Sequence, residues 1–208
     1  MKRRLLIIGA SGHGKVVADI ARLNDYLEVY FLDDNARIKD CNGCPVIGKS
    51  TDAETLNASQ ISDFFVAIGN AVIRENIMNR LANFNVISLI HPSAVVAEDV
   101  HIGIGTVVMA GAVINPGTII GKGCIINTGA TIDHDNTIAD FVHISVGAHL
   151  AGKVEINKST WVGIGTVISN NIRICEEVIL GAGTVVIKNI EKSGTYVGTP
   201  ARRIDKEN

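Results

Sequence analysis

Residues 107–144 read VVMAGAVINPGTIIGKGCIINTGATIDHDNTIADFVHI, and an aliphatic residue returns at every sixth position of this stretch. The series continues in both directions without an insertion. Two residues before most of its members stands a small or β-branched residue, although Asn136 and Ile172 depart from that pattern. The members of the series are Val96, Ile102, Val108, Ile114, Ile120, Ile126, Ile132, Ile138, Ile144, Leu150, Ile156, Val162, Ile168, Ile174, Leu180 and Val186.

A period of six fits neither a single strand nor a helix, because their side chains return to one face every 2 or 3.6 residues. Short flat strands joined by tight corners do give this period, since three of them form a triangular coil with one aliphatic side chain pointing inward from each side. Coils stacked at the parallel-strand spacing of about 4.8 Å make a prism. The pattern therefore predicts that residues 91–208 form an all-β parallel β-helix with a C-terminal tail.

Residues 1–90 have a different pattern, typical of a small Rossmann-like βαβ domain with a parallel sheet. We expect a glycine turn at Gly9–Gly14 between the first strand and the first helix. The expected strands are Arg4–Ile8, Glu28–Leu32, Asp63–Ile68 and Val86–Ile90, and the expected helices are Lys15–Leu23 and Arg74–Leu81.

The glycine turn predicts a ligand for this domain. A turn between strand and helix presents backbone N–H groups and the positive helix end to a phosphate. Asp33 and Asp34 end the next strand, where such folds place a carboxylate for ribose or base contacts. A single half-Rossmann unit suits a mononucleotide or nucleotide sugar better than NAD.

The amino-acid composition argues against some classes of binding partner. Charged residues make up 19% of the chain, the net charge is −2 and the pI is near 6.3, which gives no electrostatic reason to expect nucleic acid or an anionic membrane as partner. No apolar run reaches the roughly 18 residues of a membrane helix. We expect a cytoplasmic protein with reduced cysteines. Cys41 and Cys44 form one isolated CxxC, which favours a plain turn over a metal site, and no metal is expected.

Histidine spacing gives candidates for chemistry. Residues one coil of about eighteen apart lie above one another, so His134 should stack near Gly152, which leaves room for an extended ligand and a free backbone N–H. His143 should lie on a different face and meet His134 only between subunits. No serine or cysteine stands in a nucleophile motif, which disfavours a covalent enzyme intermediate and favours direct attack of one substrate on another.

The runs Asn127–Asp135, His143–Ala148 and Ala151-Gly152 resemble those of the nucleotide-amino-sugar N-acetyltransferases of the bacillosamine and perosamine type, and also the related sialic acid O-acetyltransferases. The resemblance extends over essentially the whole chain, from Gly9–Gly14 to the terminal Val197–Arg202. It implies a left-handed β-helix, a homotrimer, and acetyl-CoA bound in the groove between neighbouring prisms.

The resemblance also implies roles for individual residues. His134 would be the general base, Asp135 its carboxylate partner and Asn127 a polar neighbour, while His143 and the Gly152 N–H would contact the thioester end of acetyl-CoA. The N-terminal domain would hold the nucleotide near Gly12, His13, Gly14, Asp33, Asp34, Gly69 and Asn70. Histidine suits this role because its ordinary pKa lies near neutrality.

Several functions stay open at this point. The first is N-acetylation of a UDP- or GDP-linked 4-amino-dideoxy sugar in surface-glycan biosynthesis, and the second is O-acetylation of sialic acid. A metalloenzyme resembling γ-class carbonic anhydrase is remote, because His143 and His149 are six residues apart where that family has five. A non-catalytic nucleotide-sugar sensor is disfavoured by the stacking of His134 on Gly152.

Overall fold

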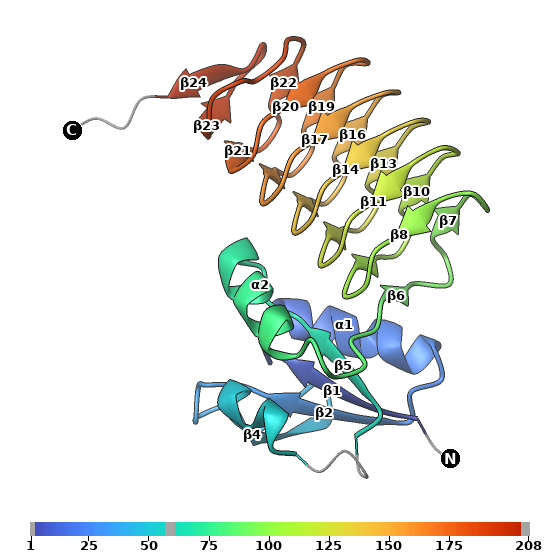
Figure 1. Cartoon of the computed structure of the whole chain (residues 1–208), viewed down its shortest axis with the longest axis vertical. Helices are drawn as coiled ribbons and strands as arrows, with labels where there is room; N and C mark the ends of the chain where they lie inside the picture. Colours follow the sequence, from blue (N-terminus) through green and yellow to red (C-terminus); the bar gives the residue numbers. More distant parts are fainter. Residues whose placement is uncertain (1–2, 57–60, 205–208) are drawn as a thin grey trace. The chain divides into compact units, whose positions relative to one another are not determined.

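Two compact units make up the chain, residues 1–92 and 93–208. The computed structural model describes residues 3–56 and 61–204 (Figure 1). No helix within these ranges is long and apolar enough to cross a membrane.

The N-terminal unit is a sheet of five strands in the order β3-β4-β2-β1-β5. Strands β1, β2, β4 and β5 run parallel, and β3 pairs antiparallel with β4. Leu5 to Ile8 on β1, which lies between β2 and β5, are almost fully buried. The elements are β1 (Arg4–Ile8), α1 (Gly12–Leu23), β2 (Glu28–Leu32), β3 (Asp40–Cys41), β4 (Cys44–Gly48), the 3-10 helix η1 (Ser50–Glu54), β5 (Asp63–Val66), α2 (Ala71–Arg80) and β6 (Leu89–Ile90).

Some predicted boundaries in this unit are wrong. Helix α1 begins at Gly12, so half of the expected glycine turn is the first turn of the helix. Helix α2 begins after Asn70, whose side chain accepts the Ile73 N–H at 3.0 Å and so satisfies one free donor of the first turn. The expected strand at Val86–Ile90 is reduced to one bridge between Val86 and Phe64, followed by β6.

The C-terminal unit is a ladder of short parallel strands (Figure 1). Its strands are β7 (Val95–Val96), β8 (His101–Ile102), β9 (Val107–Val108), β10 (Val113–Ile114), β11 (Ile119–Ile120), β12 (Ile125–Ile126), β13 (Thr131–Ile132), β14 (Thr137–Ile138), β15 (His143–Ile144), β16 (His149–Leu150), β17 (Glu155–Ile156), β18 (Trp161–Val162), β19 (Val167–Ile168), β20 (Arg173–Ile174), β21 (Val178–Leu180), β22 (Val185–Val186), β23 (Gly194–Val197) and β24 (Arg202–Ile204).

These strands form three faces of a prism. The first face runs from β7 to β22, the second from β8 to β20, and the third from β9 to β24. Most strands pair parallel with the strand eighteen residues later, as Thr131 pairs with His149. At the C-terminal end, β23 pairs with β21 after sixteen residues, and β24 pairs antiparallel with β23. The aliphatic residues of the six-residue series fill the core, with Ile126, Ile144 and Val162 at 0% exposure. An α/β unit followed by a parallel β-helix is therefore confirmed.

One edge of the prism runs between the first and second faces, and we call it the His134 edge. It carries one residue per coil at the equivalent position: Pro116, His134, Gly152, Asn170 and Lys188. The stacking shows in the backbone, because Asp135, Lys153 and Asn171 each donate their N–H to the carbonyl of the edge residue one coil below, as Lys153 does to His134 at 3.0 Å. In the last coil Val186 still pairs with Ile168, and Ile190 bridges Ile174, so the corner there is two residues shorter.

Candidate functional site

His134 and Asp135 form an exposed pair on the His134 edge. Asp135 has a φ of +58°, which turns the corner so that both adjacent side chains point outward. His134 Nδ1 lies 2.8 Å from Asp135 Oδ2, and each side chain is 54% exposed. A carboxylate can only accept a hydrogen bond, so Nδ1 carries the hydrogen and Nε2 is left as a lone-pair acceptor. The pair therefore has the tautomer that a general base needs.

The carboxylate of Asp133 also holds this corner in place, and the sequence did not indicate that role. Asp133 Oδ1 accepts the His134 N–H at 2.8 Å and the Asn115 side-chain amide at 2.9 Å. The bond from Asn115, followed by the bond from the His134 backbone, lowers the pKa of Asp133. Asp133 thus remains an ionised acceptor that holds the backbone of His134.

Gly152 lies directly against the His134 ring. A Cβ built on Gly152 would be 2.5 Å from His134 Nε2 and 2.6 Å from Cε1. The expectation that this position leaves room for an extended ligand is wrong, because the imidazole itself occupies that space. Among the residues that the structure describes, none accepts a hydrogen bond from the Gly152 N–H. A ring nitrogen and a backbone donor without a partner are thereby brought together.

His143 lies on the third face, away from His134. Its ring stacks on Trp161 with centroids 5.8 Å apart and planes 2° from parallel, as expected for residues one coil apart. Asn127 Nδ2 is 3.2 Å from His143 Nε2. The Trp161 indole N–H donates to Ser145 Oγ at 2.7 Å, which fixes the half-exposed ring. Within one chain, Asn127 and His143 form one cluster and His134 belongs to another.

In the N-terminal unit, the first turn of α1 contains Gly12, His13 and Gly14. A Cβ at Gly14 would lie 2.2 Å from the Gly9 carbonyl oxygen, so Gly14 allows the helix to pack on the β1 end, whereas a Cβ at Gly12 would meet open space. Burial, and then the charge of Arg74, lowers the pKa of His13 to about 4. The Nε2 atom of this neutral ring is buried without a hydrogen-bond partner in the described part of the chain.

Arg74 fixes the loop that follows β5. Its side chain is 1% exposed and donates to the carbonyls of Ile68 and Gly69 at 2.7 and 2.8 Å. The loop that contains Gly69 and Asn70 is therefore held in place by the buried Arg74 guanidinium. The sequence did not single out Arg74, because an arginine inside a helical pattern normally indicates a solvated face.

The two acidic residues after β2 are turned in different directions. Asp33 Oδ2 accepts the Ala10 N–H at 2.7 Å, which ties it to the glycine turn. Asp34 accepts the backbone N–H and the hydroxyl of Ser50, both at 2.9 Å, which ties it to η1. The structure thus brings Asp33 to the start of α1 and Asp34 to a neighbouring loop.

The CxxC pair forms the turn of the β3–β4 hairpin. Asn42 and Gly43 have φ of +55° and +75°, the combination that a two-residue hairpin turn requires. Cys41 and Cys44 are free and buried. Within residues 3–56 and 61–204, no three His, Cys, Asp or Glu side chains are grouped as metal ligands.

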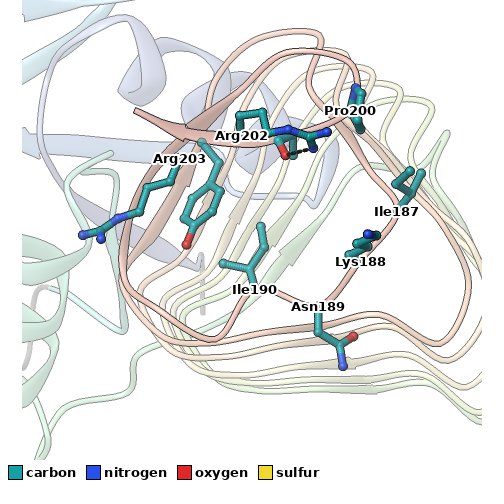
Figure 2. Close-up of a pocket in the computed structure, with 9 residues that line it drawn as sticks. Ile187, Lys188, Asn189, Ile190, Pro200, Arg202 and Arg203 are labelled. Atoms are coloured by element: carbon teal, nitrogen blue, oxygen red, sulfur yellow. Dashed lines mark hydrogen bonds between the residues drawn. The ribbon is translucent and has the colours of Figure 1, made fainter. Parts of the chain in front are cut away.

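A pocket of about 260 Å³ lies at the C-terminal end of the β-helix (Figure 2). Figure 2 shows Lys188 and Arg202 around this space, with the Arg203 guanidinium pointing away from Lys188. Arg202 and Arg203 come from β24 and Lys188 from the His134 edge. The full lining is Ile187, Lys188, Asn189, Ile190, Tyr196, Pro200, Ala201, Arg202 and Arg203.

Two family models match the chain. Residues 4–81 match the PglD N-terminal domain, and residues 99–134 match the bacterial transferase hexapeptide model of six repeats. Among curated proteins, UDP-N-acetylbacillosamine N-acetyltransferase of Bacillus subtilis (strain 168) is 39% identical over 113 residues, which is 52% of each chain. The match thus spans about half the length of that relative.

Solved structures match over nearly the full chain. The acetyltransferase domain of PglB from Neisseria gonorrhoeae FA1090, in complex with acetyl coenzyme A, is 41% identical over 98% of this chain and 100% of that one, with a TM-score of 0.93. A mutant of perosamine N-acetyltransferase from Caulobacter crescentus, in complex with CoA and GDP-perosamine, is 33% identical over 97% of each chain, also with a TM-score of 0.93.

Proposed function

Because the chain belongs to the family of two-domain hexapeptide-repeat sugar acetyltransferases, we propose that it acetylates the amino group of a nucleotide-linked amino sugar. The observation that carries this proposal is the pairing, on one exposed edge, of the Asp135-oriented imidazole with the Gly152 N–H, which has no hydrogen-bond partner among the described residues. The acetyl donor is acetyl-CoA, as in the PglB complex. Its thioester supplies an activated acetyl group.

His134 acts as the general base. Its Nε2 accepts the proton that the sugar amine loses as the amide bond forms, and the Asp135 carboxylate stabilises the resulting imidazolium through Nδ1. The thioester C–S bond breaks in the same reaction, and the imidazolium returns the proton to the departing CoA thiolate. A positioned base of this kind contributes roughly 100- to 10,000-fold to the rate. The Gly152 N–H donates to the acetyl oxygen, where negative charge develops in the transition state.

The N-terminal unit holds the nucleotide diphosphate of the sugar. No side chain caps the start of α1, so the backbone N–H groups of its first turn are available to bind a phosphate. Gly12 and His13 both belong to this first turn, where a Cβ at Gly12 would meet open space and the buried Nε2 of His13 has no hydrogen-bond partner among the described residues. Asp33, held at the glycine turn by Ala10, lies where such folds contact the ribose or base. Asp34, Gly69 and Asn70 complete the surrounding loops.

The C-terminal pocket receives the phosphates of CoA. Lys188 lies three coils above His134 on the same edge, a rise of about 14 Å at the parallel-strand spacing. That rise is comparable to the extended pantetheine arm between the thioester and the diphosphate. Lys188 and Arg202 place two cations beside the pocket at this height. Phosphate oxygens are the ligands that such side chains prefer.

The active unit is a homotrimer. His143, Asn127 and Trp161 lie on a different face from His134, so they reach its acceptor only across a subunit contact. Val146 and Ile164 are exposed one coil apart at the edge between the third and first faces. Exposed aliphatic side chains next to a half-exposed tryptophan are typical of a protein interface. Light scattering at micromolar concentration should give the mass of three chains.

The proposal is tested by measuring CoA thiol release with acetyl-CoA and a panel of acceptors: UDP- and GDP-linked 4-amino-dideoxy sugars, and free sialic acid. Activity with an amino sugar is expected, and activity only with sialic acid would establish O-acetylation instead. His134→Ala should lose at least about 100-fold. The matched control is His149→Ala, an exposed histidine one strand away whose Nδ1 bonds Thr131 at 2.8 Å. Equal activity of the two variants would refute the assignment of the base.

A further inference from the structure

A ladder of buried polar side chains lines the corners of the prism. Each donates to a backbone carbonyl fifteen residues later, as Thr118 does to Asp133 at 3.0 Å and Thr160 does to Cys175 at 3.0 Å. These bonds satisfy carbonyls that turn inward where the chain leaves a strand. The other members are Thr106, Cys124 and Thr166.

Asn136 occupies this position at the His134 corner and makes more bonds than the threonines. Its side chain is 0% exposed. Nδ2 donates to the Ala151 carbonyl at 3.0 Å, the ladder bond, and also lies 2.6 Å from the Asp133 carbonyl and 3.3 Å from the His134 carbonyl. Oδ1 accepts the Val154 N–H at 3.1 Å. One amide thereby joins the corner that carries the base to the coil above it.

The peptide groups that Asn136 holds belong to the two catalytic elements. The Ala151 carbonyl is in the same rigid peptide plane as the Gly152 N–H, so fixing the carbonyl fixes the direction of that donor. A hydrogen bond to the carbonyl also polarises the N–H. The Asp133 and His134 carbonyls belong to the corner in which Asp135 takes its positive φ. A threonine can supply only one hydrogen to this set.

We propose that Asn136 is a positioning residue that sets the geometry between the His134 ring and the Gly152 N–H. This inference rests on the proposed function and assigns to the acetyl-transfer site a buried residue that contacts neither substrate. The asparagine acts through backbone carbonyls alone. Its loss should lower kcat rather than weaken substrate binding.

Three variants test the proposal. Asn136→Ala removes every bond, Asn136→Thr keeps the ladder bond to Ala151, and Thr160→Ala removes an equivalent ladder bond on the second-to-third corner. We expect kcat of Asn136→Ala to fall about 10- to 100-fold, which is the effect of displacing a catalytic group by about 1 Å. KM for both substrates should stay within about threefold, Asn136→Thr should lose at least about threefold, and Thr160→Ala should stay within about twofold.

A second readout does not depend on turnover. In the free protein, the amide resonance of Gly152 should shift in Asn136→Ala and stay in place in Thr160→Ala. Three results would each overturn the proposal. They are an unchanged Gly152 resonance in Asn136→Ala, a kcat within twofold of wild type in a folded Asn136 variant, and equal losses of kcat in Asn136→Ala and Thr160→Ala. If Asn136→Ala does not fold, Asn136→Thr carries both measurements. A wild-type protein without acetyl transfer would refute the proposed function, while the resonance still reports on Asn136.

Discussion

Replacing Gly152 by alanine tests the site with a single methyl group. The new Cβ would lie 2.5 Å from His134 Nε2, whereas carbon contacts settle near 3.5 Å, so the ring must retreat by about 1 Å. A displacement of that size in a catalytic group costs about 100-fold in rate. Gly152 does not have a positive φ, so the backbone accepts alanine. Because the half-exposed ring can swing toward solvent, the melting temperature should not fall.

The assay is CoA thiol release at saturating acetyl-CoA and amino sugar, combined with a double-mutant cycle. Gly152→Ala should lose about 100-fold in kcat/KM, since its effect acts through the His134 ring. In a His134→Ala background the same substitution should cost much less, because there is no ring left to displace. Wild-type activity in the single variant, or equal losses in both backgrounds, would refute the reasoning.

Three further predictions follow from the described contacts. Asp135→Asn should lose about 100-fold in kcat, because an amide that donates to His134 Nδ1 leaves the hydrogen on Nε2; kcat of the folded variant checks this. Burial holds the pKa of His13 at about 4 in the fold against 6.5 in the unfolded chain. The folded state binds fewer protons, so on the order of 3 kcal/mol of stability is lost as pH falls from about 6.5 to 4. In urea unfolding, the free energy of unfolding should fall less between pH 6.5 and 4 in His13→Gln than in wild type. Lys188→Ala combined with Arg202→Ala should raise KM for acetyl-CoA about tenfold and leave kcat unchanged, with less dependence on salt than wild type.

The sequence predicted the β-helix well because its core depends on a strict period. Each inward aliphatic residue repeats every six positions, and each coil is eighteen residues long, so the stacking of His134 on Gly152 and of His143 on Trp161 could be read in advance. Strands β1 and β2 were predicted with their observed bounds because they are short buried apolar runs.

What the sequence could not predict depends on local backbone choices. An aspartate does not have to adopt a positive φ, so the outward turn at Asp135 was not readable from its type. The sequence also allows a His134 ring that leaves Gly152 uncovered. The structure shows that the ring lies against Gly152. Arg74 and Asn136 were missed as parts of the site because their burial depends on backbone carbonyls that only the fold brings within reach: Arg74 donates to the nearby loop carbonyl of Ile68, and Asn136 donates to Ala151 one coil above.

Along the first face, from β13 to β22, the eighteen-residue register is unbroken, which makes the prism a molecular ruler. The distance from the base to the Lys188 and Arg202 cations is set by a whole number of coils, so it can change only in steps of about 4.8 Å. Duplicating one eighteen-residue coil between Gly152 and Asn170 would lengthen this distance by one step, because the inserted strands would pair in the same register with the coils below and above them. Selection for a thiol carrier of given length would then act on the count of coils rather than on individual contact residues.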